Sequence, residues 1–144
     1  MLDAGAESER GSAMGTIREI MQSKPIKVRP DSSVQLALEL LIDHGISGLP
    51  VVDADDKIVG VLSEKDLLKL FYENHTQTVE SVMTRDPIAI SIDAPLVDVL
   101  DCLMAYDFRR VLIHEHGKLV GLISRADLMP TILGALLERA RHAD

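Results

Sequence analysis

Hydrophobic and polar residues follow a pattern along this chain that occurs twice. Each copy opens with a short helix, which begins at Thr16 or Thr78 and is followed by a short apolar strand. The next helix repeats its apolar residues at helical spacing along one face. Two apolar runs around a polar turn then predict a β-hairpin, and a final helix follows. Each copy therefore predicts a β-α-β-β-α unit of about 50 residues, a length typical of internal repeats.

The same elements are expected at matching positions of both copies. They are strands 26–28 and 88–90, helices 34–42 and 96–104, hairpins 49–62 and 111–123, and final helices from Ser63 and Ser124. Identical residues keep a constant spacing: Met21 and Met83 lie 62 positions apart, and Gly60 and Gly121 lie 61 apart. Because half of a core this small is marginal alone, we expect an α/β fold in which two repeats pack with pseudo-twofold symmetry.

The repeat also divides the chain into segments. We expect a disordered leader at residues 1–15, which is native or left by expression, repeat 1 with its connector at 16–77, and repeat 2 at 78–129. Pro130 suits the first turn of a new helix, so residues 130–144 are predicted to form a separate amphipathic C-terminal helix. That helix covers the core, forms a dimer contact or docks a partner.

Composition narrows the classes of function. The 144 residues carry a formal net charge of −8 and only 3% aromatic residues, which argues against a nucleic-acid-binding surface. The single cysteine, Cys102, cannot form an internal disulfide, which favours a reducing compartment and a cytoplasmic location. No apolar run approaches the ~20 residues that span a bilayer, so membrane insertion is not expected.

Four segments carry a family resemblance: GLPVVD at 48–53, GVLSEKDL at 60–67, RRVLI at 109–113 and GLISRADL at 121–128. Together they resemble a tandem pair of CBS domains, the family named after cystathionine β-synthase, and such a pair is often called a Bateman module. The resemblance implies a module that binds AMP, ADP, ATP, S-adenosylmethionine or NAD-type ligands in clefts between the repeats. It further implies a homodimer that regulates an enzyme, channel or transporter.

The residues themselves support such a site, although less specifically. Ser63 and Ser124 stand where a strand turns into a helix, and a hydroxyl beside free backbone N–H groups suits a phosphate. Asp66 and Asp127 lie three residues further on, where a carboxylate can accept hydrogen bonds from the two hydroxyls of a ribose. The alternative is that the serines only cap their helices and the aspartates complement the helix dipole. The strand residues Gly60 and Gly121 could admit a ligand close to the backbone or simply mark a bulge.

The two sites are not expected to be equal. Glu64 follows Ser63 and would repel phosphate, whereas Arg125 follows Ser124 and would attract it. We therefore expect the Ser124/Asp127 site to favour the more phosphate-rich ligand. The candidate ligand-binding residues are Ser124, Asp127, Arg109, Arg110, Arg125, Val111, Leu112 and Ile88 in repeat 2, and Ser63, Asp66, Gly48, Leu49, Pro50 and Ile26 in repeat 1. The apolar members would surround an adenine or, alternatively, pack in the core.

Other signals are discounted. The spacing of His114 and His116 does not suit a helical zinc site, and the acidic turn at residues 53–56 is too short for a calcium loop. Without a nucleophile–base pair or a metal-ligand set, we expect no enzyme activity, no catalytic residue, no metal and no obligatory cofactor. The leading hypothesis is a regulatory module that senses adenosine-containing ligands and acts on a partner protein. The alternative is a dimerisation or interaction scaffold that needs no ligand.

Overall fold

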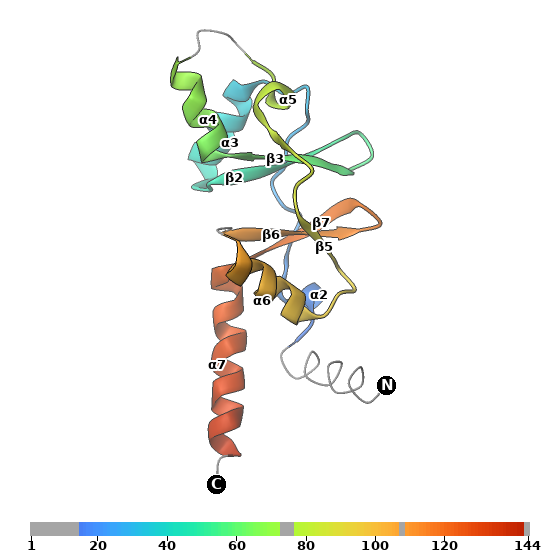
Figure 1. Cartoon of the computed structure of the whole chain (residues 1–144), viewed down its shortest axis with the longest axis vertical. Coiled ribbons are helices and arrows are strands. Elements are labelled where there is room, and N and C mark those ends of the chain that lie inside the picture. Colours follow the sequence, from blue (N-terminus) through green and yellow to red (C-terminus); the bar gives the residue numbers. More distant parts are fainter. Residues whose placement is uncertain (1–14, 73–76, 107–108, 143–144) are drawn as a thin grey trace. The chain divides into compact units, whose positions relative to one another are not determined.

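The computed structural model describes residues 15–72, 77–106 and 109–142, and these residues form two compact units of mixed helix and strand (Figure 1). One unit contains described residues of Met1–Lys24, Ala89–Glu115 and Val120–Asp144, and the other contains those of Pro25–Ile88 and His116–Leu119. The α/β fold class is confirmed. Except for Gly15, the predicted leader lies outside the described residues, as do positions 73–76 of the connector.

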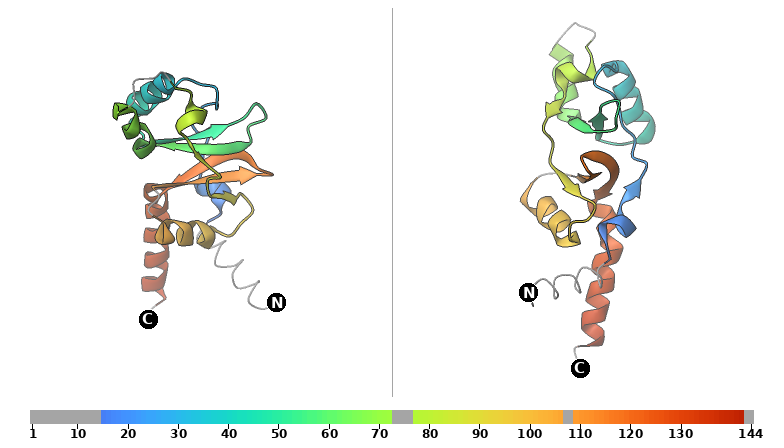
Figure 2. Two further views of the ribbon diagram at one scale, coloured as in Figure 1. Left: turned by 45° about the horizontal axis from the view of Figure 1, so that its top comes forward. Right: turned by 90° about the vertical axis from the view of Figure 1, so that its right-hand side faces the viewer.

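The unit built around Pro25–Ile88 has a three-stranded sheet in the order β2 (Gly48–Val52), β3 (Ile58–Ser63) and β4 (Thr84–Arg85). The hairpin β2–β3 is antiparallel, as predicted, with an irregularity between Val51 and Val52. Helices α3 (Val34–His44), α4 (Glu64–Leu68) and α5 (Val79–Val82) supply the other side of the core, and a 3-10 turn at Lys69–Tyr72 follows α4. Figure 2 shows these helices together on one side of the hairpin.

Local sequence explains the boundaries of α3. The hydroxyl of Ser33 accepts a hydrogen bond from the backbone N–H of Leu36 at 3.1 Å, which caps the first turn. The helix ends at Gly45, which adopts the left-handed conformation with φ of 60°. Of its predicted apolar stripe, Val34, Ala37 and Leu41 are buried, but Leu38 and Ile42 are exposed.

The other unit has a four-stranded sheet in the order β1 (Gln22–Ser23), β7 (Lys118–Ser124), β6 (Arg110–Glu115) and β5 (Ala89–Ser91). Strands β5 and β6 run parallel, whereas β1 and β7 run antiparallel. Helices α2 (Ile17–Ile20), α6 (Leu96–Ala105) and α7 (Arg125–Arg141) pack on this sheet. Its core contains side chains from all three helices, including Ile17, Val99 and Leu128.

The first helix and strand of each repeat lie in the unit that is built mainly from the second half of the chain for repeat 1 and from the first half for repeat 2. Helix α2 and strand β1 of repeat 1 thus join the repeat 2 elements, and α5 and β4 of repeat 2 join the repeat 1 elements. Ile17 of α2, the first helix of repeat 1, is fully buried in the core with Val111 and Ile123 of repeat 2. In the same way, Val79 of α5 is fully buried with Leu62 of repeat 1. Packing therefore divides the chain differently from the sequence repeat, because the short apolar helix of each repeat fills the other repeat's core.

Two predictions about elements were wrong. The predicted strand at residues 26–28 is only an isolated bridge between Val28 and Val51, and the extended pairing lies earlier, at β1. The helix predicted to begin at Pro130 is the continuation of α7, which begins at Arg125 and contains Pro130 in its sixth position. Proline near a helix start removes one hydrogen-bond donor, and the surrounding turns hold this helix together. Within the described ranges, no helix is long and apolar enough to cross a bilayer.

Candidate functional site

The end of β3 and the start of α4 bring together the first pair of predicted polar residues. Backbone N–H of Asp66 donates to Oγ of Ser63 at 3.2 Å, and Oδ2 of Asp66 accepts from the backbone N–H of Ser63 at 2.9 Å. Oγ of Ser63 also donates to Oδ2 at 3.0 Å. These reciprocal bonds form a capping box, so the capping role considered for this pair is confirmed. The Asp66 carboxylate is buried, which makes these bonds structurally important.

The second pair repeats this geometry where β7 meets α7. Backbone N–H of Asp127 donates to Oγ of Ser124 at 3.2 Å, and backbone N–H of Ser124 donates to Oδ2 of Asp127 at 2.8 Å. Asp127 is half-buried. The two Ser/Asp pairs therefore present equivalent carboxylates at equivalent strand ends, as the sequence repeat predicts.

Two further residues touch these carboxylates, and sequence reasoning missed both. Oγ1 of Thr84 lies 3.3 and 3.4 Å from the carboxylate oxygens of Asp66. Nε2 of Gln22 donates to both carboxylate oxygens of Asp127 at 3.0 Å. Gln22 and Thr84 are 62 positions apart and directly follow Met21 and Met83 of the repeat. That register was the available signal, but it gains meaning only once β1 and β4 are placed.

The strand glycines explain how these residues reach the carboxylates. A Cβ on Gly60 would lie 2.9 Å from the carbonyl oxygen of Thr84, and a Cβ on Gly121 would lie 3.0 Å from that of Gln22. These distances are shorter than ordinary van der Waals contacts, so any side chain would displace the neighbouring strand. Gly60 therefore permits the close approach of strand β4, and Gly121 permits that of strand β1.

Three arginines lie near the second pair. Arg110 begins β6 and is half-buried. Burial lowers the pKa of its guanidinium, and the negative charge of Asp127 opposes that shift. Because the ordinary pKa of arginine is so high, the guanidinium stays protonated. The backbone N–H of Arg125 donates to the carbonyl oxygen of Arg109 at 3.3 Å, so these two exposed residues are neighbours. The structure thus groups the three predicted arginines near Asp127.

The first pair has a glutamate and a glycine at the positions that correspond to Arg125 and Arg110. Glu64 takes the place of Arg125, and its backbone N–H donates to the carbonyl oxygen of Ser47 at 3.1 Å. Gly48 takes the place of Arg110 and pairs with Ser63 across the hairpin. Glu64 and Arg125 therefore take equivalent positions beside the two Ser/Asp pairs in the folded chain.

The apolar candidates have mixed environments. Leu49 and Val111 lie inside the two hydrophobic cores, which is the packing role that the sequence left open. Pro50 and Leu112 are buried without belonging to either of these clusters, and Ile26 is partly buried against the core of its unit. Ile88 is 42% exposed and directly precedes Ala89, which pairs with Leu112 in the parallel strands β5 and β6.

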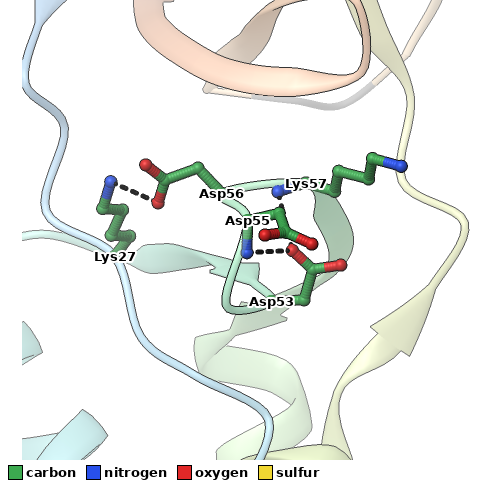
Figure 3. Close-up of polar contacts among 5 residues, drawn as sticks. All are labelled: Lys27, Asp53, Asp55, Asp56 and Lys57. Atoms are coloured by element: carbon green, nitrogen blue, oxygen red, sulfur yellow. Dashed lines mark hydrogen bonds and ion pairs between the residues drawn. The ribbon is translucent and has the colours of Figure 1, made fainter.

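The acidic turn between β2 and β3 forms a hydrogen-bonded loop, as Figure 3 shows. Oδ1 of Asp53 accepts from the backbone N–H groups of Asp55 and Lys57 at 2.8 and 3.0 Å. Asp56 pairs with Lys27 at 2.8 Å, and this hydrogen bond and charge hold the pKa of the Asp56 carboxyl below its ordinary value. The carboxylates of Asp53 and Asp56 thus form hydrogen bonds within a solvated turn, as predicted.

Two other discounted signals also have structural settings. Burial raises the pKa of the Cys102 thiol, which disfavours the reactive thiolate. His114 is the next-to-last residue of β6, and His116 lies in the turn that follows, with φ of 54°. In the part of the chain that the structure describes, no group of three or more His, Cys, Asp or Glu residues is arranged to hold a metal ion.

Comparisons with known proteins agree with this architecture. The sequence pattern of the CBS domain matches residues 17–73 and 79–134. The A-adding tRNA nucleotidyltransferase of Aquifex aeolicus is 31% identical over 81% of this chain, and the chain spans only 14% of that enzyme's length.

Solved structures match across almost their whole length. CBSX2 of Arabidopsis thaliana, crystallised in complex with AMP, is 32% identical with a TM-score of 0.74, over 83% of this chain and 97% of that one. The CBS domain pair of protein MJ0100, in complex with 5′-methylthioadenosine and S-adenosyl-L-methionine, is 28% identical with a TM-score of 0.71, over 84% and 98% of the two chains. This chain therefore belongs to the CBS domain family and contains two CBS domains in tandem.

Proposed function

We propose that this chain is a regulatory module that binds adenosine-containing ligands at its two Ser/Asp pairs. The observation that carries the proposal is the duplicated capping geometry, in which Ser63 and Asp66 are matched by Ser124 and Asp127. An aspartate that accepts backbone N–H bonds keeps lone pairs for ribose hydroxyls. Relatives crystallised with AMP, or with methylthioadenosine and S-adenosylmethionine, support this class of ligand.

The charges divide the ligands between the two sites. Arg125, with Arg109 and Arg110 nearby, favours a phosphate-bearing ligand such as AMP, ADP or ATP at the Asp127 pair. Glu64 disfavours phosphate at the Asp66 pair, so an uncharged or cationic adenosine derivative such as S-adenosylmethionine fits there better. We therefore propose different ligand preferences for the two sites, with Asp127 at the phosphate-binding one.

Thermal unfolding with and without ligand tests the proposal directly. A ligand present at ~100 times its dissociation constant adds about 2.7 kcal/mol to the free energy of unfolding. For a chain of this length, AMP or S-adenosylmethionine should therefore raise the midpoint of unfolding by several degrees. If none of AMP, ADP, ATP or S-adenosylmethionine at millimolar concentration moves the midpoint, the ligand-sensing proposal is wrong and the ligand-independent scaffold is favoured.

An exchange of exposed charges provides the matched test of the two preferences. Glu64 and Arg125 occupy equivalent, exposed positions next to their serines, so neither substitution removes a capping bond. Arg125→Glu should weaken AMP binding about fivefold or more, as expected for charges that interact across solvent. Glu64→Arg should strengthen AMP binding at the other site. Equal AMP affinity in both variants would contradict the proposed division of ligands.

We further propose that the module acts as a homodimer on an enzyme or transporter partner. A stripe of half-exposed apolar side chains runs along α7: Met129, Leu133, Leu136 and Leu137. Their spacing is that of a helix face that packs against another helix. Light scattering should give a dimeric mass for the wild type and a monomeric mass for the double variant Leu133→Glu, Leu137→Glu.

Cys102, buried without a disulfide partner, supports a reducing compartment such as the cytoplasm.

A further inference from the structure

The Asp127 carboxylate is occupied by an amide that its counterpart does not have. Nε2 of Gln22 lies 3.0 Å from both carboxylate oxygens, and the backbone N–H of Ser124 donates to Oδ2 at 2.8 Å. An amide NH₂ donates hydrogen bonds and accepts none. Together with the Ser124 N–H, it takes up three of the roughly four lone-pair sites of the carboxylate, which leaves too few for the two hydroxyls of a ribose.

The equivalent position at the other site holds a threonine with different hydrogen-bonding capacity. Oγ1 of Thr84 is 3.3 Å from the nearer carboxylate oxygen of Asp66, a longer contact than that of Gln22. A hydroxyl has one proton to donate and two lone pairs that accept. Thr84 can therefore remain beside a bound diol and accept from it, whereas the Gln22 amide nitrogen has to leave.

Strand pairing delivers Gln22 to this position. Gln22 pairs with Leu122 in β1 and β7, as Thr84 pairs with Val61 in β4 and β3. The backbone of β1 is held against β7 by its approach to Gly121. The residue itself is exposed, so its side chain can rotate into water once a ligand competes for Asp127. The backbone is thus fixed while the amide is free to move.

We propose that Gln22 is a specificity-determining residue that closes the Asp127 site to weakly held ligands. This inference rests on the proposed function and deepens it. A ligand at Asp127 first displaces the Gln22 amide, and a phosphate held by Arg125 compensates for that cost. Adenosine, which has the ribose but no phosphate, is therefore disfavoured at this site more strongly than AMP.

NMR titration of the full-length, ¹⁵N-labelled chain with adenosine and with AMP separates the two sites. The backbone amides of Asp66 and Asp127 report a dissociation constant for each site. In Gln22→Thr, which installs the residue of the other site, adenosine should bind about fivefold more tightly at Asp127 and unchanged at Asp66. The reciprocal Thr84→Gln is the matched control and should weaken binding at Asp66 alone.

A second readout follows Gln22 itself. Its side-chain NH₂ resonances in the wild type should move to those of a solvent-exposed glutamine when AMP saturates the Asp127 site. A merely structural role for Gln22 would not produce this movement or the site-selective change in affinity.

The outcomes separate this inference from the function on which it rests. If the wild type binds adenosine or AMP at Asp127 and Gln22→Thr leaves both affinities within about twofold of it or weakens them, the gating role is refuted and the proposed function stands. Stationary Gln22 side-chain resonances at AMP saturation refute it as well. If neither ligand perturbs either site in the wild type or in Gln22→Thr, the gating role is refuted, and the proposed function is refuted with it only if ADP, ATP and S-adenosylmethionine also leave the unfolding midpoint unchanged. Binding of adenosine at Asp127 in Gln22→Thr but not in the wild type would support both.

Discussion

Gly121 offers the sharpest test of how β1 is held, because a single methyl group should disturb it. A Cβ at this position would lie 2.5 Å from Sδ of Met21 and 3.0 Å from the carbonyl oxygen of Gln22. Non-bonded heavy atoms settle at about 3.5–4.0 Å, so both neighbours have to shift. The Met21 side chain can rotate, but the Gln22 carbonyl belongs to a strand paired with β7.

The magnitude follows from two opposing effects. Overpacking at a buried site costs about 1–3 kcal/mol. Replacing glycine by alanine also restricts the unfolded chain, which stabilises the folded state by about 0.4–1 kcal/mol where the residue fits. We therefore expect Gly121→Ala to lower the free energy of unfolding by about 1–2 kcal/mol. At this chain length the midpoint of thermal unfolding should fall by about 3–7 °C.

Gly134→Ala is the matched control, because it adds the same methyl group without a clash. Gly134 lies within α7, and a Cβ there would meet no heavy atom within 4 Å. Alanine is favoured over glycine inside a helix by about 0.5–1 kcal/mol, so this variant should be more stable than the wild type. Circular dichroism during urea and thermal unfolding measures both effects.

A double-mutant cycle separates the two clashes. Met21→Ala removes Sδ, so its destabilisation and that of Gly121→Ala should be less than additive if the side chain carries part of the strain. The remaining cost reports the displaced Gln22 carbonyl. If Gly121→Ala is as stable as the wild type, the close approach of β1 does not constrain this position and the reasoning fails.

Three further predictions concern single groups. Ser63→Ala should lower the free energy of unfolding by about 1 kcal/mol in urea titrations, since the capping box loses its hydroxyl; an unchanged midpoint would show that the cap is dispensable. The buried Cys102 thiol, whose pKa is raised, should resist iodoacetamide at pH 8 until the chain unfolds, and rapid labelling of the folded protein would contradict its burial. The Asp56 carboxyl should titrate below its ordinary pKa by NMR, and Lys27→Met should remove that depression. Because its pKa is lower folded than unfolded, the stability it contributes is present above the unfolded value and is lost as the pH falls through the folded value, below about pH 4. A titration unaffected by Lys27→Met would exclude Lys27 as the cause.

Elements with local causes could be predicted from the sequence. Ser63 and Ser124 followed three residues later by aspartate specify capping boxes, since a cap is formed by residues within one turn. The hairpin β2–β3 follows from two apolar runs around a turn of Asp and Lys residues. The unequal charges of the two sites also follow from the sequence alone, because Arg125 takes the position in the second repeat that Glu64 takes in the first.

Elements with non-local causes could not be predicted in this way. The pairs Gln22–Ser23 and Thr84–Arg85 have no apolar pattern, and they become strands only because β7 and β3 offer them a partner. Nothing local indicates that α2 completes the core of repeat 2 or that α5 completes that of repeat 1.

The sequence by itself thus determined the repeat, its capped helices and hairpins, and the positions of its serines and aspartates, because each depends on neighbours within a few residues. Tertiary structure alone decided which repeat receives each short helix and what touches each carboxylate. The physical reason is that a buried side chain needs a complementary cavity, and a two-residue strand needs a partner's backbone. Chain segments distant in sequence supply both, which is why Gln22 meets Asp127 only in the folded protein.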